Sequence, residues 1–131
     1  MISKINDNIY IGDQLDALNK ELLEKYKFDV VINLNNRIDP EEEKIVSSTG
    51  ASYVEADYEM DFKEMLKNIS YSLEEYSNAG LKTLVHCEAG IDRAPFVVAL
   101  YFSTKNNIEL SRAYNVVKYF RRQIMEHYEW V

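Results

Sequence analysis

The chemistry of this sequence centres on Cys87, the only cysteine, and on Arg93, six positions after it. The segment that contains both reads His86-Cys87-Glu88-Ala89-Gly90-Ile91-Asp92-Arg93. Apolar runs over 81–85 and 94–102 flank it, so we expect a buried strand to lead into the loop and a buried helix to leave it. In such a loop the backbone N–H groups converge, and the helix dipole favours negative charge. The pattern predicts a binding site for an oxyanion such as phosphate.

The same loop would hold a nucleophile. A cysteine at a helix N-terminus is stabilised as the thiolate, the form that attacks phosphorus. The planar guanidinium of Arg93 matches two phosphate oxygens, and Gly90 can adopt the positive φ that the loop requires. The residues whose N–H groups would bind phosphate are Glu88, Ala89, Gly90, Ile91, Asp92 and Arg93. A nucleophile inside an oxyanion receptor predicts phosphoryl transfer through a phosphocysteine.

A third group is required to protonate the leaving oxygen. The segment before the helix expected at 62–78 contains four candidate acids: Glu55, Asp57, Glu59 and Asp61. We rank Asp57 first, because Asp61 is better explained as the N-cap of that helix, with Glu64 completing a capping box. We assign His86 a supporting role, a hydrogen bond that shapes the loop, rather than proton transfer. The acidic side chains of Glu88 and Asp92 should face solvent or substrate.

The elements that must position these residues alternate between strands and helices. We expect a hairpin over 2–11, strands over 28–34, 51–55 and 83–86, and helices over 13–26, 41–48, 62–78, 94–105 and 109–127. Such alternation predicts an α/β fold in which helices flank a central, mostly parallel sheet. Ligands of these sheets bind at the carboxyl ends of the strands, where Cys87 falls. With 131 residues, the chain is expected to form one catalytic domain, 1–131.

The last predicted helix carries an apolar stripe that indicates a core-facing side. Its members are Ala113, Val116, Val117, Phe120 and Ile124. Arg121 and Arg122 lie on the same predicted helix, and nothing in the sequence assigns them to a site.

The charge balance limits the classes of partner. The chain has 15 basic and 22 acidic residues and a net charge of −7. That argues against general affinity for nucleic acid and for anionic membranes. A single cysteine allows no intrachain disulfide, and residues 1–10 lack the apolar run of a signal peptide, so we expect a cytoplasmic protein. Phosphorylated proteins are the expected substrates, with no metal or cofactor and a monomeric state.

These residues resemble the dual-specificity phosphatases within the cysteine-based protein tyrosine phosphatase superfamily, whose signature is His-Cys-x-x-Gly-x-x-Arg. The likeness extends over nearly the whole chain. The segment 9–12 is similar to the family's N-terminal strand and turn, 30–34 is similar to its central strand, and Asp57 lies close to the position of its general acid. The resemblance implies a protein phosphatase for phosphotyrosine, with phosphoserine and phosphothreonine as further substrates and Cys87, Arg93 and Asp57 as catalytic residues.

Within that superfamily, Arg93-Ala94-Pro95 and the segment 97–100 are most similar to the phosphatases of regenerating liver. Most relatives carry Ser or Thr directly after the loop arginine, where the hydroxyl helps the cysteine to leave, whereas Ala94 stands here. Two alternatives stay open. One is a phosphate-binding module with low turnover. The other is a phosphatase for phosphoinositides or RNA 5′-triphosphates, although such enzymes usually carry lysines around the loop and residues 88–92 contain none.

Overall fold

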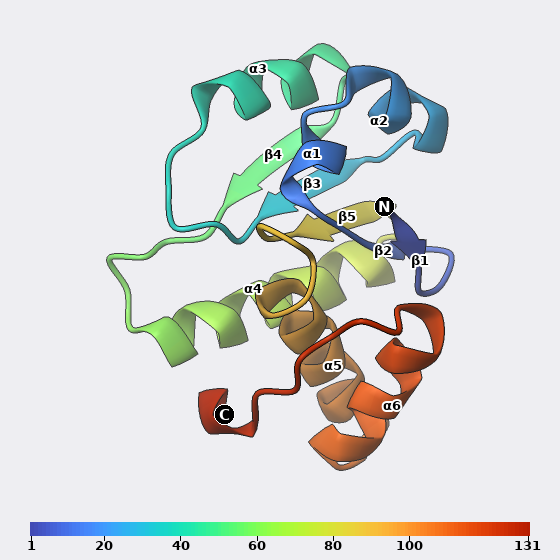
Figure 1. Ribbon diagram of the computed structural model, residues 1–131, viewed down its shortest axis with the longest axis vertical. Helices are drawn as coiled ribbons and strands as arrows, with labels where there is room; N and C mark the ends of the chain where they lie inside the picture. Colours follow the sequence, from blue (N-terminus) through green and yellow to red (C-terminus); the bar gives the residue numbers. More distant parts are fainter.

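A five-stranded sheet runs through the middle of the molecule, and helices cover both of its faces (Figure 1). The computed structural model describes residues 1–131. The strands are β1 (Ser3–Lys4), β2 (Ile9–Gly12), β3 (Val30–Asn33), β4 (Ser52–Glu55) and β5 (Thr83–His86). Their order is β1-β2-β5-β3-β4; β1 is antiparallel to β2, and all other neighbours are parallel. The predicted α/β fold with a mostly parallel sheet is confirmed.

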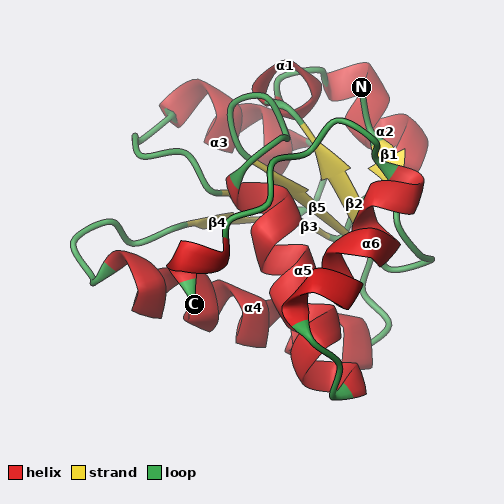
Figure 2. Ribbon diagram, turned by 60° about the horizontal axis from the view of Figure 1, so that its bottom comes forward, coloured by secondary structure: helices red, strands yellow, loops and turns green.

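The helices form one layer on each face of the sheet (Figure 2). The first layer contains α1 (Gln14–Ala17), α2 (Lys20–Tyr26) and α3 (Pro40–Ser48). The second contains α4 (Phe62–Asn78), α5 (Arg93–Asn106) and α6 (Leu110–Phe120). A short 3-10 helix, η1 (Tyr128–Trp130), follows near the C-terminus. None of these helices combines the length and the apolar composition needed to cross a bilayer.

Alternation along the strands explains why both faces of the sheet are covered. In β2, Ile9 and Ile11 pack with buried residues of α4, α5 and α6, while Tyr10 packs with those of α2 and α3. In β5, Val85 and Leu84 divide between the two cores in the same way. Successive side chains of a strand face opposite sides of the sheet, so strands enclosed by two helical layers are apolar at nearly every position.

Several predicted elements are confirmed almost to the residue. Helix α4 and strand β5 have the predicted bounds, and α3 and α5 each begin one residue before the predicted start. The predicted N-terminal hairpin is present, with Ser3 opposite Ile11. Its turn is made by the side chain of Asn6, which accepts hydrogen bonds from the N–H groups of Asn8 and Ile9.

The single helix predicted over 13–26 is wrong, because the chain forms α1 and α2 with a break between them. The side chain of Asn19 accepts a hydrogen bond from the N–H of Leu22 at 3.1 Å, an N-cap that starts a new helix. Leu15 contributed to the predicted apolar spacing, yet its side chain is 77% exposed. The N-cap at Asn19 therefore starts a separate helix, although the spacing of apolar residues predicted a continuous one.

The helix predicted as far as residue 127 is also wrong, since α6 ends at Phe120. Ala113 and Val117 are buried as the stripe predicts, but Phe120 is 46% exposed. Arg121 takes an extended conformation, with φ of −138° and ψ of 96°. The C-terminal segment, residues 121–131, then runs beside the loop that joins β5 to α5 (Figure 1).

The carboxyl ends of the four parallel strands meet at one edge of the sheet. Gly12 of β2 and Asn33 of β3 both lie opposite His86, the last residue of β5, and Glu55 of β4 lies opposite Asn33. The segments that follow these strands therefore emerge side by side. They carry the predicted nucleophile, the predicted acid and several polar residues, so this edge is the candidate site.

Candidate active site

The loop between β5 and α5 holds the predicted nucleophile. Cys87 follows β5 directly and is 2% exposed, so a reacting group must enter the loop to reach its sulfur. Helix α5 begins at Arg93, and the positive end of its dipole lies at the loop. Gly90 has a φ of 70°, as predicted, and a β-carbon there would lie 2.7 Å from the carbonyl oxygen of Gly12. Only glycine therefore fits this position.

The peptide groups of this loop are oriented alike, with their carbonyl oxygens outward. The carbonyl oxygen of Glu88 accepts from the N–H of Gln14 at 3.0 Å, and that of Ile91 accepts from the N–H of Met125 at 2.9 Å. The oxygens of Ala89 and Gly90 accept from the side chain of Arg121 at 3.4 Å and 2.8 Å. The oxygen of Asp92 accepts from the N–H of Phe96 at 3.2 Å. No N–H group of residues 88–92 donates a hydrogen bond within the protein. The two polar groups of a planar trans peptide point in opposite directions, and the outward carbonyl groups of 88–91 share their peptide planes with the N–H groups of 89–92. These N–H groups therefore face the inside of the loop and are free to bind an anion.

The side chain of Arg93 is held from one side. Its Nη1 donates to the carbonyl oxygen of Leu34 and to the hydroxyl of Tyr58, both at 3.0 Å. Its Nη2 donates to Oδ1 of Asn35 at 3.3 Å. A guanidinium has five N–H donors, so two remain for a ligand. The three acceptors hold the planar group in one orientation, as bidentate binding of phosphate requires.

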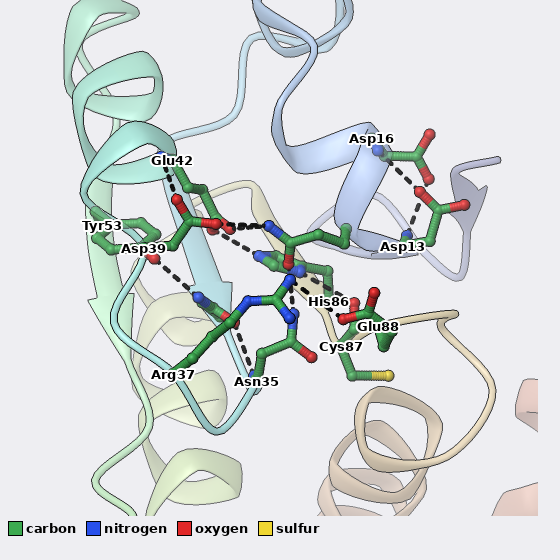
Figure 3. Close-up of polar contacts among 12 residues, drawn as sticks. Asp13, Asp16, Asn35, Arg37, Asp39, Glu42, Tyr53, His86, Cys87 and Glu88 are labelled. Carbon is green, nitrogen blue, oxygen red and sulfur yellow. Dashed lines mark hydrogen bonds and ion pairs between the residues drawn. The ribbon is translucent and has the colours of Figure 1, made fainter.

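His86 is fully buried between Cys87 and Glu42 (Figure 3). Its Nδ1 lies 3.3 Å from the carbonyl oxygen of Cys87, and its Nε2 lies 2.6 Å from Oε2 of Glu42. A carbonyl oxygen can only accept, so the proton of the first contact is on Nδ1, and the contact between Nε2 and Oε2 requires a second, shared proton. His86 thus makes a hydrogen bond to the start of the loop, which is the contact that its predicted supporting role requires.

Glu42 connects the two halves of the site. Its Oε1 accepts a hydrogen bond from Nε2 of Gln14 at 2.9 Å. The amide oxygen of Gln14 accepts from the amide of Asn35, which in turn contacts Arg93. Glu42 is therefore linked to the backbone of Cys87 through His86 and to Arg93 through two amides. Buried networks in which each member is bonded fix the positions of their side chains.

Replacing Glu42 by glutamine should lower the free energy of unfolding by about 1–2 kcal/mol, because charge-assisted hydrogen bonds become neutral ones. Urea unfolding followed by circular dichroism measures the change. Glu43→Gln, at an exposed position of the same helix, is the matched control and should cost less than about 0.5 kcal/mol. Equal losses in the two variants would show that the contact with His86 does not stabilise the protein.

The structure distinguishes the candidate acids. The side chain of Asp61 accepts a hydrogen bond from the N–H of Glu64 at 3.2 Å, so Asp61 is the N-cap of α4, although the Glu64 side chain does not return the second bond of a capping box. Asp61 therefore already has a structural role, as predicted. Of the other candidates, Glu55 has a carboxyl whose pKa is raised by burial, and the charges of Glu43 and Glu42 raise it further.

Asp57 lies in the segment 56–60 between β4 and α4, and its neighbour Tyr58 contacts Arg93. The hydroxyl of Tyr58 accepts from Arg93 at 3.0 Å and donates to the carbonyl oxygen of Leu34. Asp57 is exposed and lines a cavity of about 380 Å³ between this segment and residues 36–38. Its Oδ1 accepts from the N–H of Glu59 at 3.0 Å. Its carboxyl makes no hydrogen bond to Cys87 or Arg93 and faces the cavity, where a leaving oxygen could reach it.

The two acidic side chains of the loop point away from its centre. Oε2 of Glu88 lies 3.3 Å from Nη2 of Arg37, and both side chains are more than half exposed. Oδ1 of Asp92 lies 2.7 Å from Nε2 of His127 in the C-terminal segment. Neither carboxylate therefore occupies the space that the loop N–H groups enclose.

Several residues that contact the site were not assigned to it from the sequence, among them Glu42, Tyr58 and Arg121. Glu42 lies among neighbouring acids on a short helix, so no pattern marked it as the buried one. Arg121 was predicted to lie within the last helix, but α6 ends one residue before it, at Phe120. Its guanidinium is half-buried; desolvation lowers its pKa, and the charges of Asp16 and Asp13 act in the opposite direction.

The site consists of a buried cysteine, a loop of free N–H groups and an arginine at the end of that loop. This arrangement is the one found in the cysteine-based phosphatases. The family model "Dual specificity phosphatase, catalytic domain" matches residues 9–131. The chain belongs to this family.

Among curated proteins, tyrosine-protein phosphatase vhp-1 of Caenorhabditis elegans is 28% identical over 134 residues, which cover 99% of this chain and 20% of that protein. Human dual specificity protein phosphatase 16 is 30% identical over 139 residues, covering 98% of this chain and 19% of its own length. The chain thus spans about a fifth of these two relatives. It covers 77% of the putative tyrosine phosphatase 123R of Invertebrate iridescent virus 6, which is 29% identical over 119 residues, or 88% of this chain.

Solved structures show the same fold. Tk-PTP in its active form superposes with a TM-score of 0.80 at 21% identity, covering 98% of this chain and 90% of that one. The PTP-2 phosphatase of Cydia pomonella also gives a TM-score of 0.80, at 17% identity, with 98% of this chain and 84% of that one covered.

Proposed function

We propose that this protein is a phosphatase that hydrolyses phosphotyrosine in proteins, with phosphoserine and phosphothreonine as further substrates. The observation that carries the proposal is the loop of residues 88–92, whose N–H groups have no partner in the protein and surround the buried Cys87. With the free donors of Arg93, they supply the fixed dipoles that a transferring phosphoryl group needs. Membership in the dual specificity phosphatase family supports the same chemistry.

In the first step, the thiolate of Cys87 attacks phosphorus, and the P–O bond to the substrate side chain breaks in line. The loop N–H groups and Arg93 hold the three equatorial oxygens, over which the negative charge is spread. Asp57 gives its proton to the leaving oxygen. The products of this step are a free hydroxyl group and a phosphocysteine.

In the second step, water attacks the phosphocysteine. Asp57, now a carboxylate, accepts a proton from this water, and the electrons of the S–P bond return to Cys87 as the thiolate. Every proton and electron pair is thus accounted for by Cys87, Asp57 and water. We propose cytoplasmic phosphoproteins with neutral or basic flanking residues as substrates, since the protein carries a net charge of −7 and like charges repel.

Repeated turnover of an aryl phosphate by the protein tests this proposal. Cys87→Ser should abolish turnover and keep the binding of inorganic phosphate, because the loop N–H groups remain. Turnover that survives this change would exclude the covalent mechanism. Binding without turnover in the unchanged protein would instead indicate a phosphate-binding module.

We further propose that the loop works like that of the phosphatases of regenerating liver, because Ala94 follows the loop arginine. Ala94 is buried in the first turn of α5. A hydroxyl at this position would donate a hydrogen bond to the departing thiolate, and the methyl group of alanine cannot. Hydrolysis of the phosphocysteine should therefore limit turnover and produce an initial burst of product.

Ala94→Ser should raise kcat by about tenfold or more and leave the burst rate nearly unchanged, because one hydrogen bond to a charged group contributes about 1.5–3 kcal/mol. Rapid-quench kinetics separate the two steps. Ala94→Gly is the control, since it alters the position without adding a hydroxyl. No burst in the parent protein, together with no gain from serine, would show that the first step is limiting.

A further inference from the structure

Asp92 occupies an unusual position in the phosphate loop. It is the N-cap residue of α5, yet its side chain makes no hydrogen bond to the helix. An aspartate at this position ordinarily accepts from the N–H of the second or third helical residue. In α5 the third residue is Pro95, which has no N–H. Of the two usual donors only the N–H of Ala94 remains, next to that of Arg93 at the same end of the helix.

Those donors lie at the helix end where the phosphate would bind. A helix N-terminus attracts any nearby anion, whether it is a ligand or a side chain of the same protein. If the carboxylate of Asp92 turned to cap α5, it would place a negative charge in the anion site and compete with phosphate. The structure shows this carboxylate turned the other way, towards the C-terminal segment.

His127 holds the carboxylate in that outward position. Nε2 of His127 lies 2.7 Å from Oδ1 of Asp92, and Nδ1 lies 2.8 Å from Oε2 of Glu129. The imidazole stacks on Trp130 with ring centroids 3.8 Å apart and 7° between the planes. The backbone N–H of His127 donates to the hydroxyl of Tyr114 at 3.0 Å. The ring is therefore fixed on several sides.

The charge of His127 strengthens this contact. Both ring nitrogens face carboxylates, and only the imidazolium can donate to both. Burial acts to lower the pKa of His127, but the hydrogen bonds to Asp92 and Glu129 outweigh it, and the pKa is raised. The other charged or titratable groups around the cluster include the Tyr114 hydroxyl, Tyr128, Glu126 and Lys63, whose charge acts on Glu129.

We propose that His127 is a positioning residue that keeps the carboxylate of Asp92 out of the phosphate site. The inference rests on the proposed function, since it assumes that the loop binds phosphate. A competing carboxylate within the chain can be displaced by saturating substrate, so its release should raise KM and leave kcat unchanged. A residue that only supported the fold would not produce this split.

His127→Gln should weaken the binding of inorganic phosphate, measured by calorimetry, by about three- to tenfold, the effect of one charge at a helix N-terminus. KM for an aryl phosphate should rise in proportion. In the double variant Asp92→Asn/His127→Gln, the competing charge is absent, so the phosphate affinity should return to within about twofold of that of Asp92→Asn alone. The proposal would be overturned if the double variant bound phosphate as weakly as His127→Gln does. It would also be overturned if His127→Gln left the phosphate affinity unchanged.

Glu129→Gln is the matched control, since it removes a carboxylate from the same cluster and leaves the contact between His127 and Asp92 in place. An equal loss of affinity in this variant would also overturn the proposal. Should His127→Gln fail to fold, the parent protein provides the test: sulfate binding should weaken as the pH rises and His127 loses its proton. That dependence should be absent in Asp92→Asn; if it persists, His127 does not act through Asp92.

The outcome is separable from that of the proposed function. Calorimetry reports anion binding whether or not the protein turns over substrate. Phosphate binding without turnover would reject the phosphatase and still decide the role of His127. A parent protein that binds no phosphate would reject the positioning role directly.

Discussion

Asp57→Asn should lower kcat/KM on phosphotyrosine peptides by about 10² to 10⁴, the usual contribution of a positioned general acid. Asparagine keeps an oxygen that can accept from the N–H of Glu59, the hydrogen bond that Asp57 makes in the structure, so the segment should retain its shape. The loss should shrink for nitrophenyl phosphates, whose leaving groups depart without a proton. Steady-state kinetics over a series of leaving groups measure this dependence.

Two neighbouring acids serve as controls. Asp61→Asn preserves a good N-cap for α4, and Glu59→Gln changes an exposed carboxylate in the same segment as Asp57. Neither should alter the dependence on the leaving group. If Asp61→Asn shows that dependence and Asp57→Asn does not, the assignment of the acid is wrong.

Arg93→Lys should lower kcat/KM by about 10²-fold or more, comparable to the removal of an oxyanion donor. Lysine keeps the charge and loses the planar fork. The structure strengthens this expectation, because three acceptors from Leu34, Asn35 and Tyr58 orient the guanidinium and leave two donors for the substrate. An ammonium group cannot satisfy those acceptors and bind phosphate in a bidentate manner at once.

Arg122→Lys is the matched control for this change, since it makes the same substitution at an exposed position. It should leave kcat/KM within about twofold of the parent value. Circular dichroism should confirm that Arg93→Lys is folded. Near-normal kinetics in a folded Arg93→Lys protein would refute the proposed role of the guanidinium.

The parts of the fold that the sequence predicted best are those with strong local signals. Helix α4 has a capping residue at one end, Asp61, and a glycine with positive φ, Gly80, just after the other. Strand β5, Thr83–His86, is buried at every position and is followed at once by Cys87. Signals of this kind act over a few residues, so a single sequence contains all the information that they require.

The break between α1 and α2 was missed although its cap at Asn19 is local, but the other errors arose where distant contacts decide the structure. Helix α6 should have continued on periodicity alone, but Arg121 makes hydrogen bonds to Ala89 and Gly90, some 30 residues away. Glu42 was missed for the same reason: its partner His86 lies 44 positions later in the chain. The loop itself could be identified from its spacing, because its residues are contiguous. The residues that hold the loop in place are not.

The attachment of Arg121 also has a consequence for the order of folding. Besides the loop, its guanidinium donates to the carbonyl oxygen of Ile11 at 3.3 Å and to the hydroxyl of Ser3 at 2.9 Å. The N-terminal hairpin and the C-terminal segment, more than 100 residues apart in the chain, thus converge on one side chain beside the anion site. Contacts between such distant parts close late, because loop-closure entropy opposes them. Catalytic competence should therefore be the last property that the refolding chain acquires, after its sheet and helices have formed.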